Sequence, residues 1–177
     1  GSPNRLALVR TLSEFLNTTD KPVTLAIADL DRFKNINDTL GHVAGDELIR
    51  QACHKMTNVI GHRGMIARLG GDEFAIALFD RSLNDSLPLI DQMIAACNAD
   101  FSIFGHQINI ATSIGVVAAQ GGTDAEPIDL LRLADLALYD AKRRGGNQAR
   151  VFDQSMDESI RFRQQIEQGL HNAIAND

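Results

Sequence analysis

Apolar residues recur every three or four positions in several stretches of the chain, which is the spacing of one helix face. The first of these stretches opens with Asn4, a residue type that caps helix N-termini. Gly145 and Gly146 follow the fourth, and glycine readily adopts the left-handed conformation that ends helices. We therefore predict helices over residues 4–17, 43–60, 84–99 and 128–144, and an amphipathic helix carrying Met156, Ile160, Ile166, Leu170 and Ile174.

Shorter apolar runs with β-branched residues lie between these helices and indicate buried strands. One run follows Pro22 and ends near Asp29. Two runs flank Gly70 and Gly71 and predict the arms of a hairpin with a tight turn. The stretches "FSIFG" and "QINIATSIGVVAA" predict a second hairpin, and a short strand is expected near Val151.

This order of elements predicts an α+β fold with a central mixed, mainly antiparallel sheet flanked by helices. Its core is a strand-helix-helix-strand-strand unit to which the second hairpin is added. A chain of 177 residues with 44% hydrophobic content suits one domain with a substantial core. The longest apolar runs are too short to span a membrane, so we expect no membrane contact by this domain.

The formal net charge of −6 argues against a broad nucleic-acid-binding face. A polyanionic substrate would need local cationic help, which a metal ion can supply. Cys53 and Cys97 lie inside predicted helices and are expected to be buried, reduced thiols, which favours a cytoplasmic domain. Gly1 and Ser2 resemble a cloning remnant, so we expect the domain to begin at Pro3 inside a longer protein.

The stretch "ADLDRFKNINDTLGHVAGDEL" breaks the structural pattern, because aspartate disfavours strands and yet Asp29 ends a buried one. A dense set of polar groups follows, namely Asp31, Lys34, Asn37, Asp38, His42 and Asp46. A purely structural interpretation is also open: Asp31 caps a helix, and Asn37, Asp38 and Gly41 form a turn. In that interpretation Lys34 is a solvated lysine and His42 a structural histidine.

The stretch "ARLGGDEFAI" is the second break in the pattern. Viewed alone, it is a hairpin turn with its acids facing water. If its strands neighbour the strand of Asp29, Asp72 and Glu73 approach that residue and three carboxylates crowd together. Their repulsion would raise a pKa or drive the loop apart unless a hard cation bridges them, and oxygen ligands suit Mg²⁺ better than zinc. Gly70 and Gly71 let the backbone approach a phosphate, so the turn predicts a metal and phosphate site.

These residues are recognisable as a set. "RLGGDEF", together with "DLDRFKNINDTLGHVAGD", "AKRRGGN" and the opening "PNR", resembles the GGDEF family, the diguanylate cyclases of bacteria, over essentially the whole chain. The resemblance implies a GGDEF domain over residues 3–153 with the fold of class III nucleotide cyclases and the polymerase palm. It implies the condensation of two GTP molecules into cyclic di-GMP and two pyrophosphates, with Mg²⁺ or in its place Mn²⁺, by a two-fold homodimer.

The resemblance also assigns roles to the acidic residues of both motifs. Asp29 and Asp72 are expected to hold the metal through their carboxylates, and Leu30 through its backbone carbonyl. Asp72 or Glu73 is expected to help deprotonate the attacking 3′-hydroxyl group.

The same resemblance assigns the substrate contacts. Asn37 and Asp46 are expected to read the guanine edge, since an amide and a carboxylate match its acceptor and its paired N–H donors. His42 is expected to line the same pocket. The residues expected to meet the phosphates are Lys34, Lys142, the backbone near Phe33, and the turn glycines Gly70 and Gly71.

Two positions depart from the family pattern. The Arg-x-x-Asp motif of the inhibitory product site is replaced by Gly61-His62-Arg63-Gly64, so we expect no feedback inhibition through it. The usual Gly-Arg-Asn is replaced by Gly145-Gly146-Asn147, so a phosphate-facing arginine is missing. Either Arg143 or Arg144 takes its place, or turnover is weak.

Residues 154–177 resemble the connector that leads from a GGDEF domain into an EAL phosphodiesterase domain. We therefore expect an upstream sensor and a downstream EAL domain in the full-length protein, for which a membrane anchor is compatible with the sequence. The rival function is a GTP-binding regulatory module with weak or no catalysis that controls the attached EAL domain. The intact Gly-Gly-Asp-Glu-Phe favours catalysis, and a purely structural dimerisation module would not need the guanine-reading pair.

Overall fold

A computed structural model describes residues 4–175 of the chain, without the side chains of residues 159 and 160. Several positions named above therefore lie outside the described residues. These are Gly1 and Ser2, the expected domain start at Pro3, the side chain of Ile160, and residues 176–177 at the end of the expected connector.

A five-stranded sheet in the order β2-β3-β1-β6-β7 forms the centre of the molecule. Its strands are β1 (Pro22–Leu30), β2 (Gly64–Gly70), β3 (Glu73–Phe79), β6 (Thr112–Gln120) and β7 (Ala149–Val151). β3 is antiparallel to both β1 and β2, β6 is antiparallel to β1, and β7 alone runs parallel to its neighbour β6. The predicted mixed, mainly antiparallel sheet is confirmed.

The second predicted hairpin is wrong in its longer arm. β4 (Phe101–Ile103) and β5 (His106–Ile108) pair only with each other, and β6 belongs to the main sheet. Residues 109–111 separate the two, and there the Asn109 side chain donates to the Asn98 carbonyl oxygen over 3.0 Å. The hydrophobic pattern continues through this break, because Ile108 and Ile110 are both buried, so periodicity could not reveal it.

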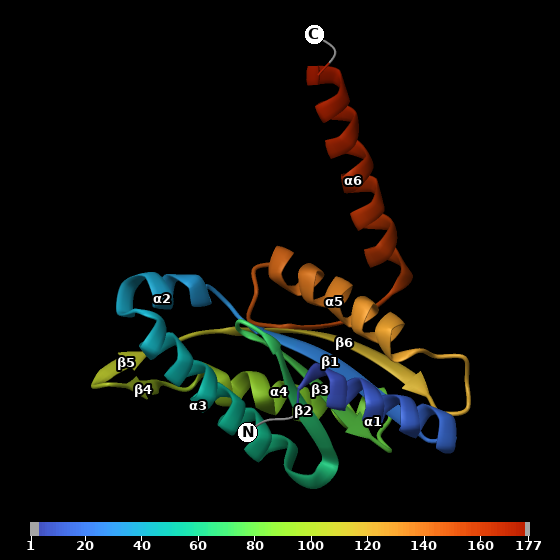
Figure 1. Ribbon diagram of the computed structural model, residues 1–177, viewed down its shortest axis with the longest axis horizontal. Helices are drawn as coiled ribbons and strands as arrows, with labels where there is room; N and C mark the ends of the chain where they lie inside the picture. The colour runs from blue at the N-terminus through green and yellow to red at the C-terminus, as the bar shows by residue number, and fades with distance from the viewer. Residues whose placement is uncertain (1–3, 176–177) are drawn as a thin grey trace.

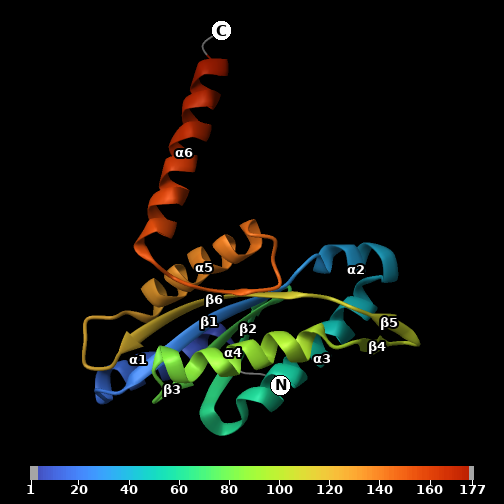
Figure 2. The ribbon, with the colours of Figure 1, turned by 180° about the vertical axis from the view of Figure 1, so that it is seen from behind.

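Helices cover both faces of the sheet (Figures 1 and 2). α3 and α4 pack on one face through one buried cluster, and α1 and α5 pack on the other through a second. The helices are α1 (Arg5–Thr18), α2 (Phe33–Leu40), α3 (His42–Ile60), the short 3-10 helix η1 (Gly61–Arg63), α4 (Leu83–Asn98) and α5 (Pro127–Arg143). The Asn4 side chain accepts a hydrogen bond from the Ala7 amide at 3.0 Å, which confirms the predicted cap of α1.

In the structural interpretation of the first motif, Lys34 is correctly a solvated lysine, since it is exposed, and the turn is correct only at Gly41. That residue lies between α2 and α3 with a φ of 87°. Asn37 and Asp38 lie inside α2 and not in a turn, because the helix extends through Leu40. Asp31 does not cap α2; the capping position is Arg32, which has a left-handed φ of 60° and makes no side-chain cap bond.

The last helix, α6 (Gln154–Ala175), projects from the body of the domain (Figure 1). Met156 is buried at its base. Farther along, the apolar side chains at positions 162, 166, 170 and 174 are between 47% and 76% exposed. The predicted amphipathic helix is confirmed, and its role as a connector remains a prediction.

Two sequence expectations concern the surroundings of the domain. Within residues 4–175, no helix is both long and apolar enough to cross a membrane. Cys97 is buried in α4 and Cys53 is half-buried in α3, and no disulfide joins them.

A buried carboxylate fastens the end of α5 to β7. Asp140 accepts hydrogen bonds from Arg143 at 3.1 Å, from Arg144 at 2.9 Å and from Arg150 at 3.0 Å. Burial alone would raise the pKa of Asp140, but the three guanidinium groups outweigh it and hold the pKa below its ordinary value. Asp140 is therefore charged in the folded protein and ties the helix end to the sheet edge.

We expect Asp140→Asn to lower the free energy of unfolding by roughly 1–3 kcal/mol at pH 7, because it removes charge-assisted hydrogen bonds from a buried site. The folded-state pKa is depressed, so this stabilisation is present above the unfolded pKa and is lost as the pH falls through the folded value. Urea unfolding of both proteins measures it. The difference should stay constant between about pH 7 and 5 and shrink below about pH 4; a difference that grows with acidity would contradict this account.

Candidate functional site

Strand register brings the two motifs together. Asp29 on β1 lies opposite Glu73 on β3, and Gly70 at the end of β2 also pairs with Glu73. The two residues between them, Gly71 and Asp72, form the turn of the β2–β3 hairpin, so this turn lies beside the end of β1. The predicted approach of the second motif to Asp29 is therefore confirmed.

Asp29 is a buried acid whose charged form is poorly stabilised by its surroundings. It is only 5% exposed, its Oδ2 accepts a hydrogen bond from Lys142 Nζ, and its Oδ1 is buried with no hydrogen-bond partner among the described residues. Burial and the neighbouring Asp72 carboxyl raise the pKa of Asp29 to about 8, against the lowering effect of Lys142. Asp29 and Asp72 are close together, and one oxygen of Asp29 has no partner among the described residues. Additional positive charge or a bound proton is therefore needed to stabilise this pair.

This donor set fits a hard divalent cation. The carboxylates of Asp29 and Asp72 and the carbonyl of Leu30, the last residue of β1, offer oxygen only, which suits Mg²⁺. The unsatisfied Oδ1 of Asp29 supports this fit. Among residues 4–175, however, no three His, Cys, Asp or Glu side chains are arranged to hold a metal, so the acids alone do not complete a metal site, and the expected crowding of three carboxylates remains a prediction.

Glu73 lies directly across the β1–β3 strand pair from Asp29. It lines a cavity of about 250 Å³ together with Arg5, Arg132 and Asp135. Burial raises the pKa of Glu73, and the charges of Asp135 and Asp72 raise it further. Burial and neighbouring negative charge thus both favour the protonated form of Glu73, and its part in proton transfer remains a prediction.

The two residues expected to read guanine come from adjoining helices. Asn37 on α2 packs against the backbone of α3, since a Cβ added at Gly45 would lie only 1.8 Å from its Oδ1. That Oδ1 is buried and has no hydrogen-bond partner within the described part of the chain. Asp46 follows Gly45 directly along α3, so the backbone that Asn37 contacts also carries this carboxylate.

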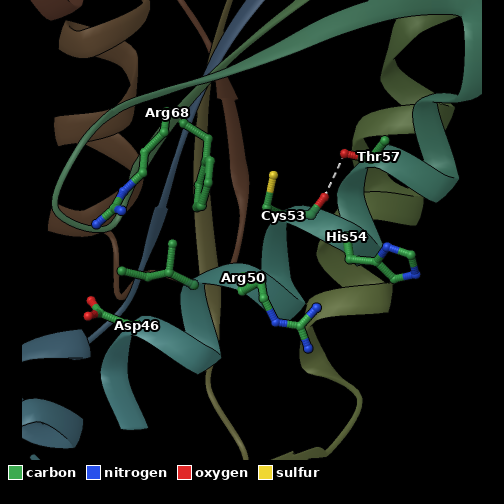
Figure 3. Close-up of a pocket in the computed structure, with 8 residues that line it drawn as sticks. Asp46, Arg50, Cys53, His54, Thr57 and Arg68 are labelled. Atoms are coloured by element: carbon green, nitrogen blue, oxygen red, sulfur yellow. Dashed lines mark hydrogen bonds between the residues drawn. The ribbon is translucent and has the colours of Figure 1, made fainter. Parts of the chain in front are cut away.

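Asp46 is at one end of a cavity of about 510 Å³ between α3 and the β2–β3 hairpin (Figure 3). Both apolar and polar side chains line the cavity. Its lining residues are Asp46, Ile49, Arg50, Cys53, His54, Thr57, Arg68 and Phe74. A flat, partly polar ring suits such a space.

The expected phosphate contacts are only partly assembled. Lys142 reaches the acid pair from α5 through its bond to Asp29. Lys34 and His42 are exposed on α2 and α3, and the described residues include no polar contact of either with another site residue. Phe33 is buried at the start of α2, which leaves only its backbone available to a ligand.

The loop that lacks the family arginine is held by Asp31, a contact that the sequence did not reveal. The Asp31 carboxylate accepts hydrogen bonds from Ser113 Oγ at 2.8 Å and from the Asn147 amide at 2.9 Å. A Cβ at Gly146 would lie 2.8 Å from Asp31 Oδ2, and the φ of Gly146 is +73°. The loop therefore has little room for a side chain at 146.

The two arginines expected to replace the missing one are otherwise engaged. Arg143 and Arg144 both donate to Asp140, whereas Lys142 on the same helix turns to Asp29. Lys142 is therefore the cation that α5 contributes to the acid pair.

The replaced product-site motif is sterically closed. An added Cβ at Gly64 would lie 2.2 Å from the Ala77 carbonyl oxygen, because β2 and β3 approach closely there. Arg63, the one arginine of this stretch, donates to the carbonyl oxygens of Val59 and Ile60 at the end of α3.

Comparison with known proteins identifies the family. The family model for the diguanylate cyclase GGDEF domain matches residues 1–148. The chain belongs to the GGDEF domain family. It is 34% identical over 181 residues to the signaling protein YkoW of Bacillus subtilis, covering 99% of this chain and 22% of YkoW. It is 35% identical over 148 residues to the diguanylate cyclase DosC of Escherichia coli K12, covering 79% of this chain and 30% of DosC.

Solved structures agree with this GGDEF assignment. The GGDEF domain of TpbB (YfiN) from Pseudomonas aeruginosa superposes with a TM-score of 0.85 at 32% identity, covering 90% of this chain and 95% of that one. The palm-like fold of GGDEF cyclase domains is thus confirmed for this chain. The chain spans less than a third of the length of the two curated relatives, whereas it matches nearly the whole of the TpbB domain.

We expect no feedback inhibition of this GGDEF domain by cyclic di-GMP at residues 61–64, because both required side chains are absent. The double variant Gly61→Arg with Gly64→Asp should not restore binding, since the Cβ at 64 collides with Ala77. Isothermal titration with cyclic di-GMP, alongside urea unfolding, measures both properties. Micromolar binding to the unmodified domain that is abolished by changes at 61–64 would contradict this expectation.

Proposed function

We propose that this GGDEF domain is a diguanylate cyclase that condenses two GTP molecules into cyclic di-GMP and two pyrophosphates. The observation that carries the proposal is the pairing of Asp29 with Asp72 at the end of β1, beside Lys142 and with one carboxylate oxygen unsatisfied. The name of the relative DosC, a diguanylate cyclase, supports the same reaction class.

The proposed reaction is attack of each 3′-hydroxyl on the α-phosphate of the partner nucleotide. Asp29, Asp72 and the Leu30 carbonyl would hold Mg²⁺, or Mn²⁺ in its place, which when bound supplies charge neutralisation at the phosphates. Lys142 adds a cation at the same place. Asp72 or Glu73 accepts the hydroxyl proton, and the pKa of Glu73, raised by burial and by the charges of Asp135 and Asp72, makes its carboxylate a stronger base. Phosphoryl transfer of this kind depends mainly on positioning and charge.

Selectivity for GTP follows from the two groups on α2 and α3. Asn37 keeps its Oδ1 against Gly45, so its amide nitrogen is available to donate to a guanine acceptor. The Asp46 carboxylate accepts from the N–H donors on the guanine edge. Adenine presents a ring acceptor where guanine presents N1–H, so it would leave the carboxylate without that partner.

Each domain binds one GTP in this proposal, so catalysis requires a two-fold homodimer in which two substrates face each other. Activity should therefore rise more steeply than in proportion to protein concentration. We place this activity in the cytoplasm and assign it to residues 3–153, with residues 154–177 as the connector to a downstream EAL domain and a sensor upstream.

A second function is favoured by Gly146 alone. Without an arginine there, and with Arg143 and Arg144 held by Asp140, the domain has one phosphate cation fewer than the family pattern. A GTP-binding module that regulates an attached EAL domain needs binding without rapid turnover. Tight GTP binding with no product at high protein concentration would favour this second function.

We expect Asp72→Asn to lower the rate of cyclic di-GMP formation by at least ~10²-fold, because it removes charge stabilisation from the reacting phosphate. The measurement is product formation from GTP and Mg²⁺ by the purified domain. Asp91→Asn, an exposed acid on α4 outside the site, is the matched control and should leave the rate unchanged. Equal rates in Asp72→Asn and the unmodified protein would rule out the proposed mechanism.

A further inference from the structure

The turn that carries Asp72 has almost no packing support. A Cβ added at Gly70 or at Gly71 would meet no atom within 4 Å, so both residues border open space. The β2–β3 ladder is also irregular just before the turn, because the pairing register shifts between Arg68 and Gly70. Two strand ends and two glycines do not by themselves fix the position of a side chain.

One side chain holds this turn. The Arg68 guanidinium donates from Nε at 3.0 Å and from Nη2 at 2.8 Å, both to the carbonyl oxygen of Gly71. Within residues 4–175, no other side chain hydrogen-bonds to the backbone of the turn. The Gly71 carbonyl belongs to the peptide that leads into Asp72, so these two bonds orient the peptide plane on which the Asp72 side chain depends.

Arg68 is itself fixed at its backbone. It pairs with Phe74 on β3, and Asn4 forms an isolated parallel bridge to it from the residue that caps α1. The Arg68 side chain is exposed, so it adds little to the hydrophobic core. A side chain so placed, anchored at its base and bonded twice at its tip, is suited to setting geometry and not to supporting the fold.

We propose that Arg68 is a positioning residue of the cyclase, which holds the Gly71–Asp72 turn so that the Asp72 carboxylate stays beside Asp29. The catalytic part of this inference rests on the proposed function. The structural part, the ordering of the turn by Arg68, is independent of it.

A direct role in substrate binding is the rival explanation, because Arg68 also lines the cavity that contains Asp46. In Figure 3 the guanidinium of Arg68 points away from His54 and Thr57 on the opposite wall. Both of its recorded hydrogen bonds go to the turn. The geometry therefore favours positioning over nucleotide contact.

The test combines backbone dynamics with kinetics in the purified domain. Arg68→Ala removes both hydrogen bonds, and Arg68→Lys keeps the charge but loses the two-pronged geometry. Arg10→Ala, an exposed arginine on α1, is the matched control. Nitrogen-15 relaxation should give order parameters at Gly71 and Asp72 of about 0.85 in the unmodified domain and below about 0.6 in Arg68→Ala.

In the kinetic arm, Arg68→Ala should lower kcat by roughly 10²-fold, because the misplaced Asp72 no longer meets its partner. KM for GTP should change by less than about threefold in Arg68→Ala. The kcat of Arg68→Lys should lie between those of Arg68→Ala and the unmodified domain. Unchanged order parameters in Arg68→Ala would overturn the proposal, and so would a raised KM at constant kcat. If the unmodified domain makes no product, the proposed function fails and the order parameters alone decide the role of Arg68.

Discussion

The repulsion between the carboxylates of Asp29 and Asp72 is the constraint around which this domain is organised. Asp29 cannot be moved to solvent, because it lies near the end of a buried central strand, and the hairpin paired to that strand carries Asp72 beside it. Lys142 offsets only part of this cost, since burial and the Asp72 carboxyl keep the pKa of Asp29 at about 8 despite it. In the proposed function, the metal ion that would accompany GTP supplies the missing positive charge.

The scaffold explains how an unfavourable pair can persist. β1 is the middle strand of the sheet, with a helical layer and a separate buried cluster on each face, so its end cannot shift without disturbing both clusters. Asp31 and Asp140 then fix the segment that follows α5: the first holds the loop after α5, and the second fastens the end of α5 to β7. The unfavourable contact between the two acids is local, whereas the packing that holds them in place extends over most of the domain.

The sequence was sufficient wherever a short-range pattern decides the structure. The helices other than α2 and η1, the β2–β3 hairpin and the approach of Asp72 to Asp29 follow from periodicity, turn chemistry and the pairing of neighbouring elements. It was insufficient where tertiary contacts decide. The strands break at residues 109–111 although the apolar pattern continues there. Arg32, with a left-handed backbone, occupies the capping position that was expected for Asp31. The hydrogen bonds of Asp31 and Arg68 join groups whose positions only the assembled fold defines. Glu73 shares its cavity with Arg132 and Asp135 of α5, which only the assembled fold brings to it.

The separate β4–β5 hairpin has a consequence for how such domains can diverge. Side chains alternate between sheet faces with a period of two, so inserting or deleting one residue in β1 or β3 would send every following side chain to the opposite face. The small hairpin shares no ladder with the main sheet, and its tip carries the exposed Phe104. The β4–β5 tip can therefore be lengthened or shortened without changing which face of the main sheet the site residues occupy. New binding contacts can arise at this tip while the site stays intact.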